Sequence, residues 1–366
     1  MNRLLRALML LVVLASLVAA GISYAMLAQI RRPADPEATE VVEFEILPGQ
    51  SAAEIAAGLR DTNLIRQPLL FRFMLREREA SDQLMAGTYQ LSPSMTMGEI
   101  ISALQVAPSF EETEFQTIEG MRMEEVAEVI VDAGLAESTE DFLAVARDAA
   151  PFKENHARLE SIPDGQGLEG YLFPSTYRIE ATATITDVIE KMLTDGFDAS
   201  YETFENQVIV ENRSVHDIVT MASIVQREAA NDDEMAHLAY IFWNRLKPEH
   251  LAESGGLLGA DPTVQYIAGY SEEQQTWWRN DLTQAELDVD NPYNTRKTAG
   301  LPPGPIANPG LAALRAAARP GPLRPDGSDG ENDLYFVAKC GEKAHTFAAT
   351  LDEFNVLAEE FRTCEQ

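Results

Sequence analysis

A single glutamate, Glu228, has the setting that a general acid requires. It ends residues 221–228, which read as a helix, and it lies there at the edge of an apolar face, two turns beyond Met221 and one beyond Ile224 and Val225. Burial beside apolar groups disfavours the ionised form of a carboxyl group and raises its pKa. A carboxyl group that stays protonated near neutral pH can donate a proton to a leaving group. Most glutamates at the edge of an apolar face are surface charges, so the surrounding sequence has to decide.

Aromatic and proline-rich stretches could build a cleft beside this acid. Residues 168–177 set three aromatic rings around a proline. These rings could form walls that exclude water, or they could belong to the core. Glu169, in the same stretch, could contact a ligand or tie the loop to its surroundings. Residues 300–310 must form a stiff loop, because their prolines remove backbone donors and fix φ.

Further polar residues are candidates for ligand contacts, each with a structural alternative. Asp261 lies in a proline-bounded turn, where an aspartate commonly bonds its own backbone, yet it could serve as a second carboxylate. Arg245 could anchor a loop or contact the ligand, and His345 could fasten a hairpin or exchange protons. The full set of candidates for ligand contacts is Glu169, Tyr171, Phe173, Tyr177, Asn244, Asp261, Thr263, Tyr293 and Asn294. No pair of histidines or carboxylates has the spacing of metal ligands, so the sequence predicts no metal and no cofactor.

The apolar pattern predicts that helices position Glu228. Ser214 can cap the helix that carries it, with Asp217 at the capping-box position. The other elements expected in this half of the chain are a helical region over 185–207, helices over 234–246, 311–318 and 351–362, and a buried strand over 333–338 that forms a hairpin with residues 345–347.

A repeat of strand, turn and amphipathic helix occupies the first third of the chain. Residues 44–59 and 115–130 are the two clear copies, and a weaker copy spans 89–104. Repeated units of this size bury one another's apolar faces. Residues 41–91 are consistent either with a small packing module or with a glycan-binding module of the LysM type, whose strand–helix–helix–strand pattern they resemble.

The N-terminus has the features of a membrane anchor. Residues 7–30 carry no charge, and Arg3 and Arg6 precede them. The stretch is long enough to cross a bilayer as a helix. The positive-inside bias then places residues 1–6 in the cytoplasm and the rest of the chain outside. The alternative is a cleaved signal peptide with a site at residues 23–25, but the apolar stretch is longer than a signal usually carries.

Charge and cysteine content narrow the range of partners. The chain has 28 basic and 59 acidic residues, a net charge of −31. Nucleic acids and anionic lipids bind clustered lysine and arginine, so this balance argues against both. The two cysteines, Cys340 and Cys364, could pair in an oxidising compartment, which their spacing alone does not decide.

Seven short motifs, in order, resemble those of the endolytic murein transglycosylases, the MltG/YceG-like family. They are Leu-Glu-Gly-Tyr-Leu-Phe-Pro-x-Thr-Tyr from residue 168, Met-Ala-Ser-Ile-Val-x-x-Glu from 221, Phe-x-Asn-Arg-Leu from 242, Asp-Pro-Thr-Val-x-Tyr from 261, Pro-Tyr-Asn-Thr from 292, Gly-Leu-Pro-Pro-Gly-Pro-Ile from 300 and His-Thr-Phe from 345. Together with the anchor and the LysM-like segment, the resemblance covers nearly the whole chain.

The resemblance implies an enzyme that cuts the glycan strands of peptidoglycan from within. Members of the family cleave the MurNAc–GlcNAc linkage, leave a 1,6-anhydro-MurNAc end and act close to the peptidoglycan synthases at the membrane. The family's catalytic glutamate falls on Glu228. Two positions depart from the family: Gln226 stands where many relatives have a second glutamate, and Gly259 where they tend to have a glutamine.

Two rival functions stay open beside a lytic transglycosylase. One is a hydrolytic muramidase with Glu228 as the acid and Asp261 as the second carboxylate, since ordinary glycosidases use two. The other is a non-catalytic glycan-binding scaffold of wall synthesis.

The expected fold is α+β: an N-terminal transmembrane helix, a LysM-like subdomain and a mostly helical catalytic domain with a small β-sheet. The expected divisions are a cytoplasmic N-terminus (1–6), a transmembrane anchor (7–30), a linker (31–40), a LysM-like domain (41–108), a second repeat-like segment and connector (109–167) and the catalytic domain (168–366). The expected location is the bacterial inner membrane, crossed once, with the catalytic domain on the periplasmic side.

Overall fold

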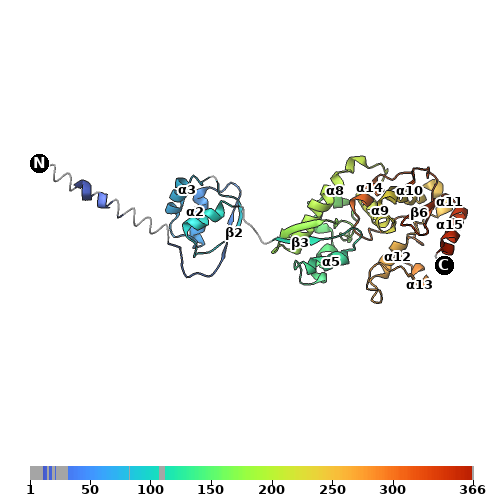
Figure 1. Ribbon diagram of the computed structural model, residues 1–366, viewed down its shortest axis with the longest axis horizontal. Coiled ribbons are helices and arrows are strands. Elements are labelled where there is room, and N and C mark those ends of the chain that lie inside the picture. The colour runs from blue at the N-terminus through green and yellow to red at the C-terminus, as the bar shows by residue number, and fades with distance from the viewer. Residues whose placement is uncertain are drawn as a thin grey trace. The chain divides into compact units, whose positions relative to one another are not determined.

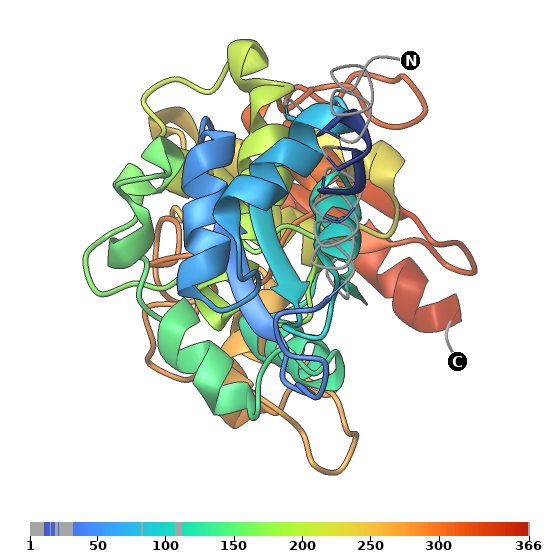
Figure 2. The same ribbon diagram turned by 90° about the vertical axis from the view of Figure 1, so that its left-hand side faces the viewer.

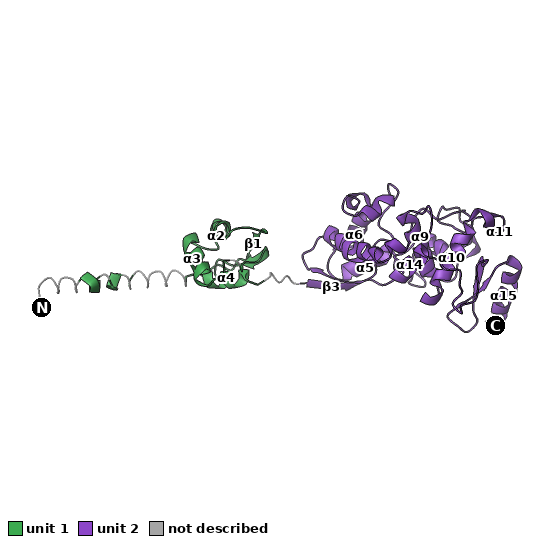
Figure 3. Ribbon diagram, turned by 90° about the horizontal axis from the view of Figure 1, so that it is seen from above, with its two compact units in different colours: residues 1–110 green, residues 111–366 purple. Residues whose placement is uncertain are grey.

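The computed structural model describes residues 11–14, 16–18, 21, 32–81, 83–106 and 112–364. The chain divides into two compact units, an N-terminal unit of residues 1–110 and a C-terminal unit of residues 111–366 (Figure 3). Most of the expected anchor at residues 7–30 lies outside the described residues. Within the described part of the chain, we find no helix with the length and apolar character needed to cross a membrane.

The N-terminal unit is a strand–helix–helix–strand module followed by one more helix, drawn in blue and cyan in Figure 2. Its elements are β1 (Val42–Ile46), α2 (Ala52–Asp61), α3 (Pro68–Glu77), β2 (Gly87–Leu91) and α4 (Met97–Leu104). The two strands pair antiparallel with Phe44 opposite Tyr89, and alternate side chains of β1 turn inward. Ser51 and Glu54 form a capping box that starts α2. This is the predicted order of elements; glycan binding by the module stays a prediction.

The C-terminal unit is mostly helical, with two small antiparallel sheets. Its helices are α5 (Met123–Asp132), α6 (Thr139–Ala146), α7 (Ile185–Lys191), α8 (Ala199–Glu202), α9 (Val215–Glu228), α10 (Met235–Arg245), α11 (Leu251–Ser254), α12 (Asp261–Ala268), α13 (Gln284–Leu287), α14 (Leu311–Ala318) and α15 (Leu351–Cys364). Its strands are β3 (Glu112–Gln116), β4 (Thr176–Glu180), β5 (Tyr335–Ala338) and β6 (His345–Ala348), paired β3–β4 and β5–β6. Short 3₁₀ turns connect several of these elements, and a π-helical segment, Met192–Asp198, separates α7 from α8.

Helix α9 lies at the centre of this unit and packs against α10, α12 and α14 (Figure 1). Ser214 caps it as predicted: its hydroxyl accepts from the Asp217 N–H, and the Asp217 carboxylate accepts from the Ser214 N–H at 2.9 Å. Nine of its residues are buried: His216 and the eight consecutive residues from Ile218 to Val225, among which Thr220 and Ser223 are polar. The helix ends at Glu228 because Ala229 has extended backbone angles.

The second clear repeat copy belongs to the C-terminal unit. Its strand β3 pairs with β4, and Phe115 stacks on Tyr177 with ring centroids 5.2 Å apart. Phe115 and the apolar face of α5 therefore complete the core that surrounds α9. The sequence could not show this, because the partner strand lies about sixty residues further along the chain.

The C-terminal hairpin differs in one respect from the expectation. Strand β5 was expected to be buried, but its first three residues are half-buried and Ala338 is exposed. Helix α15 covers one side of the hairpin, and a disulfide between Cys340 and Cys364 joins the hairpin turn to the end of that helix, with Cα atoms 6.3 Å apart. The sequence did not decide whether Cys340 and Cys364 pair, and the structure shows that they do.

Candidate active site

Glu228 meets the start of another helix. Its carboxylate accepts a hydrogen bond from the backbone N–H of Asp261, the first residue of α12. The free N–H groups and the dipole at a helix N-terminus favour a negative charge there. The site is therefore formed by the last residue of α9 and the first turn of α12, which lie 33 residues apart in sequence but pack together.

Burial and neighbouring charges together raise the pKa of Glu228 to about 7. Desolvation is the largest cause, and the Asp261 carboxylate adds to it, since a second negative charge disfavours ionisation. His345, Arg245 and the Asp261 N–H act in the opposite direction and lower the pKa of Glu228. The result is a carboxyl group that can lose and regain a proton near neutral pH.

Arg245 supplies a fixed positive charge beside this carboxyl group. Burial lowers the pKa of the guanidinium to about 10, and the Glu228 carboxylate partly offsets that effect. Its Nε donates to the Leu334 carbonyl at 2.7 Å, and Nη1 donates to the Leu258 carbonyl. Arg245 thus anchors the segment before β5 and the segment before α12, so the structure gives it the anchoring role and also places it near Glu228.

His345 is held by a carboxylate that the sequence did not single out. Its Nδ1 lies 2.7 Å from Glu234, and its backbone N–H donates to the same carboxylate at 3.1 Å. Glu234 is fully buried and also accepts from the Ala230 N–H at 2.6 Å. Although burial alone would raise the pKa of Glu234, these hydrogen bonds hold it below its usual value. The pair fastens the β5–β6 hairpin to the segment that follows Glu228.

The side chain and the backbone of Asp261 have different partners: the backbone N–H contacts Glu228, whereas the carboxylate contacts Arg296. The carboxylate is exposed and receives a hydrogen bond from Arg296 at 2.5 Å. It still lies close enough to Glu228 to raise the pKa of that group. The Asp261 carboxylate therefore forms an ion pair with Arg296, and it acts on Glu228 only through the electrostatic effect of its charge.

Polar side chains of α9 also hold the proline-rich loop in place. The Pro303 carbonyl accepts from His216 Nε2 at 2.9 Å, Ser223 Oγ accepts from the Ile306 N–H at 3.0 Å, and Gln226 Oε1 accepts from the Gly310 N–H at 2.9 Å. One helix thus positions both Glu228 and residues 303–310. Gln226 acts on the loop and not on the acid, because residues two positions apart on a helix point in different directions.

Glu169 lies in a buried network centred on Asn308. Both oxygens of Glu169 accept from the Met123 N–H at the start of α5, and one accepts from Asn308 Nδ2 at 3.1 Å. Burial is the main cause that raises the pKa of Glu169 to about 8, with a further contribution from Glu124. Asn308 Oδ1 accepts from the N–H groups of Gly170 and Leu172 at 3.0 and 2.9 Å. These bonds make Glu169 a tie for its loop.

Replacing Asn308 with alanine is expected to lower the free energy of unfolding by about 3 kcal/mol, because it leaves several buried backbone and carboxyl groups without partners. Chemical denaturation followed by circular dichroism measures the change. Asn155→Ala is the matched control: Asn155 is exposed and its amide makes a single hydrogen bond, to Glu190, so a change within about 0.5 kcal/mol is expected. Equal effects of the two substitutions would show that the Asn308 network does not support the fold.

Two of the three aromatic candidates belong to the core. Tyr171 is fully buried, and its hydroxyl bonds to His216 Nδ1 at 3.0 Å. Tyr177 is buried, and its hydroxyl donates to the Phe173 carbonyl at 2.6 Å. Phe173 is half-buried. For Tyr171 and Tyr177 the structure therefore selects the packing alternative over the wall of a cleft.

The remaining candidates are mostly buried too. Asn294 is fully buried and donates to the carbonyls of Leu287 and Val289, and Thr263 is fully buried and donates to the Ala260 carbonyl at 2.6 Å. Both therefore shape the loops around α12. Asn244 is buried on α10, and Tyr293 is half-buried beside Tyr266, with ring centroids 5.2 Å apart.

A cavity of 310 Å³ lies beside Glu169 and brings some of these groups together. Tyr266 and Tyr293 line it, and so do Gln166 and Pro305. Because Tyr266 belongs to α12, the helix that begins against Glu228 also borders this cavity. Glu169 and Tyr293 are thus the sequence candidates that face a space large enough for a ligand group.

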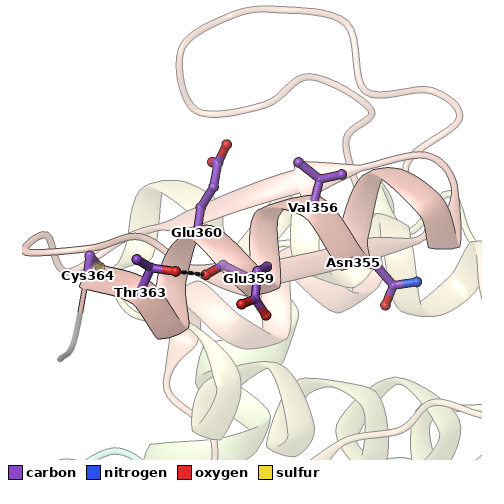
Figure 4. A pocket seen from close by; sticks show the side chains of 6 residues that line it. All are labelled: Asn355, Val356, Glu359, Glu360, Thr363 and Cys364. Carbon is purple, nitrogen blue, oxygen red and sulfur yellow. Dashed lines mark hydrogen bonds between the residues drawn. The ribbon is translucent and has the colours of Figure 1, made fainter.

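A second hollow has no relation to these residues. It measures 660 Å³ and lies on one face of α15, where Asn355, Val356, Glu359, Glu360, Thr363 and Cys364 line it (Figure 4). All six side chains come from a single helix, and none is a predicted site residue. Among the described residues, no group of three or more histidines, cysteines and carboxylates could hold a metal ion.

Comparisons with known proteins give a consistent family match. The sequence model described as the YceG-like family matches residues 44–360. The chain is 30% identical over 340 residues to a protein of Bacillus subtilis (strain 168) named endolytic murein transglycosylase, covering 90% of this chain and 87% of that one. A protein of the same name from Streptococcus pneumoniae serotype 2 (strain D39) is 29% identical over 352 residues, which span 91% of this chain and 60% of the relative. The crystal structure of a putative yceG-like protein from Listeria monocytogenes is similar with a TM-score of 0.56 and 29% identity, covering 87% of this chain and 99% of that one.

Proposed function

Because the chain belongs to the YceG-like family, we propose that it is a membrane-anchored endolytic lytic transglycosylase of peptidoglycan. It cleaves the MurNAc–GlcNAc bond within glycan strands and leaves 1,6-anhydro-MurNAc ends. The observation that carries the proposal is Glu228 itself. Its carboxyl group, with a pKa raised to about 7, lies against the N-terminus of α12 and close to Arg245 and His345.

The reaction needs only one carboxyl group. The Glu228 carboxylic acid donates its proton to the oxygen of the glycosidic bond, and the bond from C1 to that oxygen breaks with its electron pair moving to the oxygen. The C6 hydroxyl of the same MurNAc then attacks C1, and the Glu228 carboxylate accepts the hydroxyl proton. The acid returns to its starting state, and the tethered nucleophile replaces a bound water and its base.

The surroundings of Glu228 suit both halves of this cycle. Desolvation keeps the group protonated until the leaving oxygen takes the proton. The Asp261 N–H, Arg245 and His345 then stabilise the carboxylate that forms. Since those donors are fixed by contacts to Leu334, Leu258 and Glu234, they need no rearrangement during the reaction.

The cavity beside Glu169 supports a path for the glycan strand along α12. A pyranose ring binds well against aromatic side chains with hydrogen-bonding groups at its edge, and Tyr266 and Tyr293 offer both. We place the strand along this face, from Glu228 at the start of the helix toward Tyr293. The stiff loop at residues 303–310 adjoins the cavity through Pro305 and would limit the access of water.

A hydrolytic muramidase is the alternative, because Asp261 stands near Glu228. The product distinguishes the two. We expect mass spectrometry of digests of purified sacculi to show anhydro ends, and reducing MurNAc ends as the main product would overturn the lytic reaction.

We also expect Asp261→Asn to keep at least a tenth of the wild-type rate near pH 6, since the exposed carboxylate pairs with Arg296 and touches no reacting atom in the lytic mechanism.

The anchor and the N-terminal unit complete the proposal. Residues 7–30 carry no charge and would cross the inner membrane once, which puts the remainder of the chain on the periplasmic side. The strand–helix–helix–strand module would hold a glycan strand in the manner of a LysM domain. An enzyme so anchored would act on nascent strands beside the synthases that produce them.

A further inference from the structure

A further cavity, separate from the Glu228 site, lies where α10 ends. It measures 400 Å³, and its lining includes Ile209, Val210, Glu211 and Arg213 together with residues of α10. Arg213 and Lys247 line it, and each cation lies over an aromatic ring: the Arg213 guanidinium is 4.6 Å from the Trp243 ring centroid, and Lys247 Nζ is 5.3 Å from that of Tyr240. Within the described parts of the chain, neither cation forms a salt bridge. In a protein with a net charge of −31, two unpaired cations at one cavity indicate a place for an anion.

Asn244 lines this cavity and carries an acceptor that the fold leaves unused. The side chain is 1% exposed, and its Nδ2 donates to the Glu331 carbonyl at 3.3 Å. That bond fixes the orientation of the amide, because the opposite orientation would bring two acceptor oxygens together. Oδ1 is buried and has no hydrogen-bond partner among the described residues. A buried acceptor left without a partner costs free energy, which a ligand with an N–H group would recover.

The lining therefore calls for one negative charge and one N–H donor on the same small ligand. Glu211 also lines the cavity, and its carboxylate disfavours a dianion such as phosphate more than a carboxylate with a single charge. Ile209 and Pro320 provide apolar walls. A short peptide with a free carboxylate has these features: the charge for Arg213 and Lys247, an amide N–H for Asn244, and small side chains for the apolar walls.

We propose that this cavity binds the carboxylate-bearing peptide that a murein strand carries, as a second site of recognition beside the glycan cleft. The assignment to murein rests on the proposed function, whereas the preference for an acyl peptide carboxylate rests on the cavity alone. Helix α10 connects the two sites, since Asn244 lines the cavity and the next residue, Arg245, lies near Glu228. A bound peptide would thus hold its strand on the same helix that supports the acid.

The test is titration calorimetry of the full chain in detergent with N-acetyl-D-alanyl-D-alanine, a small acyl dipeptide. We expect a dissociation constant in the range of about 1 mM and at least about tenfold weaker binding by the double variant Arg213→Gln/Lys247→Gln. The C-terminal amide of the same dipeptide should bind equally weakly to the wild type. The matched control is Arg72→Gln/Arg76→Gln, which removes the same charge from exposed positions of the N-terminal unit and should leave the affinity unchanged.

Three outcomes would overturn the proposal: no binding by the wild type up to about 10 mM, equal affinity of the wild type and the cavity variant, or equal affinity for the acid and the amide. Asn244→Leu adds an independent check, because it removes the acceptor and keeps the volume, and unchanged affinity would also count against the site. The measurement needs no turnover, and Glu228→Gln should bind the dipeptide like the wild type. Loss of the lytic reaction and loss of this site are therefore observed separately.

Discussion

Replacement of Glu228 with glutamine is expected to lower the rate of fragment release from purified sacculi by about 10³-fold, because general acid catalysis contributes typically about 10²- to 10⁴-fold. The amide has the shape of the carboxylic acid, and its oxygen can still accept from the Asp261 N–H, so the site keeps its geometry. What the variant lacks is a proton of suitable acidity for the leaving oxygen and a base for the C6 hydroxyl. Chromatography with mass spectrometry of the released muropeptides measures the effect.

The control for this experiment is Glu202→Gln, the same chemical change at an exposed position on α8. Both variants should have the circular dichroism spectrum and the melting temperature of the wild type to within a few degrees. We expect Glu202→Gln to release fragments at the wild-type rate. If Glu228→Gln does so as well, Glu228 is not the acid, and a glycan-binding scaffold without enzymatic activity becomes the better interpretation.

The parts of the site that the sequence predicts are those governed by local signals. The start of α9 depends on Ser214 and Asp217, three residues apart, and the helix around Met221 and Val225 depends on apolar residues at helical spacing. The irregular loop at residues 300–310 depends on its prolines. Such signals act within a few residues, so they can be seen in a sequence without knowledge of the fold.

The contacts that set the chemistry join residues far apart in sequence, and no local signal indicates them. His345 bonds to Glu234, which lies 111 positions away in sequence, and Asn308 bonds to Glu169, which lies 139 positions away. Glu234 precedes an ordinary amphipathic helix, and Asn308 lies in a proline-rich loop where an asparagine usually serves a turn. Each becomes noticeable only when the fold buries it against a partner.

The sequence also does not show which aromatic residues belong to the core and which line a cavity. Tyr171 and Tyr177 occur in a stretch that suits a cleft wall and a core equally, since both environments favour large rings. Burial decides the matter: these two side chains are buried, whereas Tyr293 and Tyr266 line a cavity. Tyr293 was among the predicted contacts, but Tyr266 was not: a proline-bounded turn was expected at Asp261, and only the structure shows that this motif forms helix α12.

The catalytic efficiency is expected to fall as the pH rises above about 7, by about tenfold for each further pH unit. Glu228 must be protonated in the free enzyme to act as the acid, and its pKa is raised to about 7, so the active form predominates below that pH and is lost above it. A glutamate with its ordinary pKa of 4.5 would give this loss near pH 4.5 instead. The measurement is kcat/KM for soluble glycan fragments between about pH 5 and pH 9.

Asp261→Asn provides the variant that links this profile to Glu228. Because the Asp261 carboxylate raises the pKa of Glu228, removing its charge should move the alkaline limb of the profile to lower pH while the backbone N–H contact remains. A shift in that direction identifies the titrating group as a neighbour of Asp261, whereas Asp288→Asn, an exposed aspartate that follows α13, should leave the limb in place. An alkaline limb that stays fixed or rises in Asp261→Asn would assign the pH dependence to another residue, and with it the role of acid.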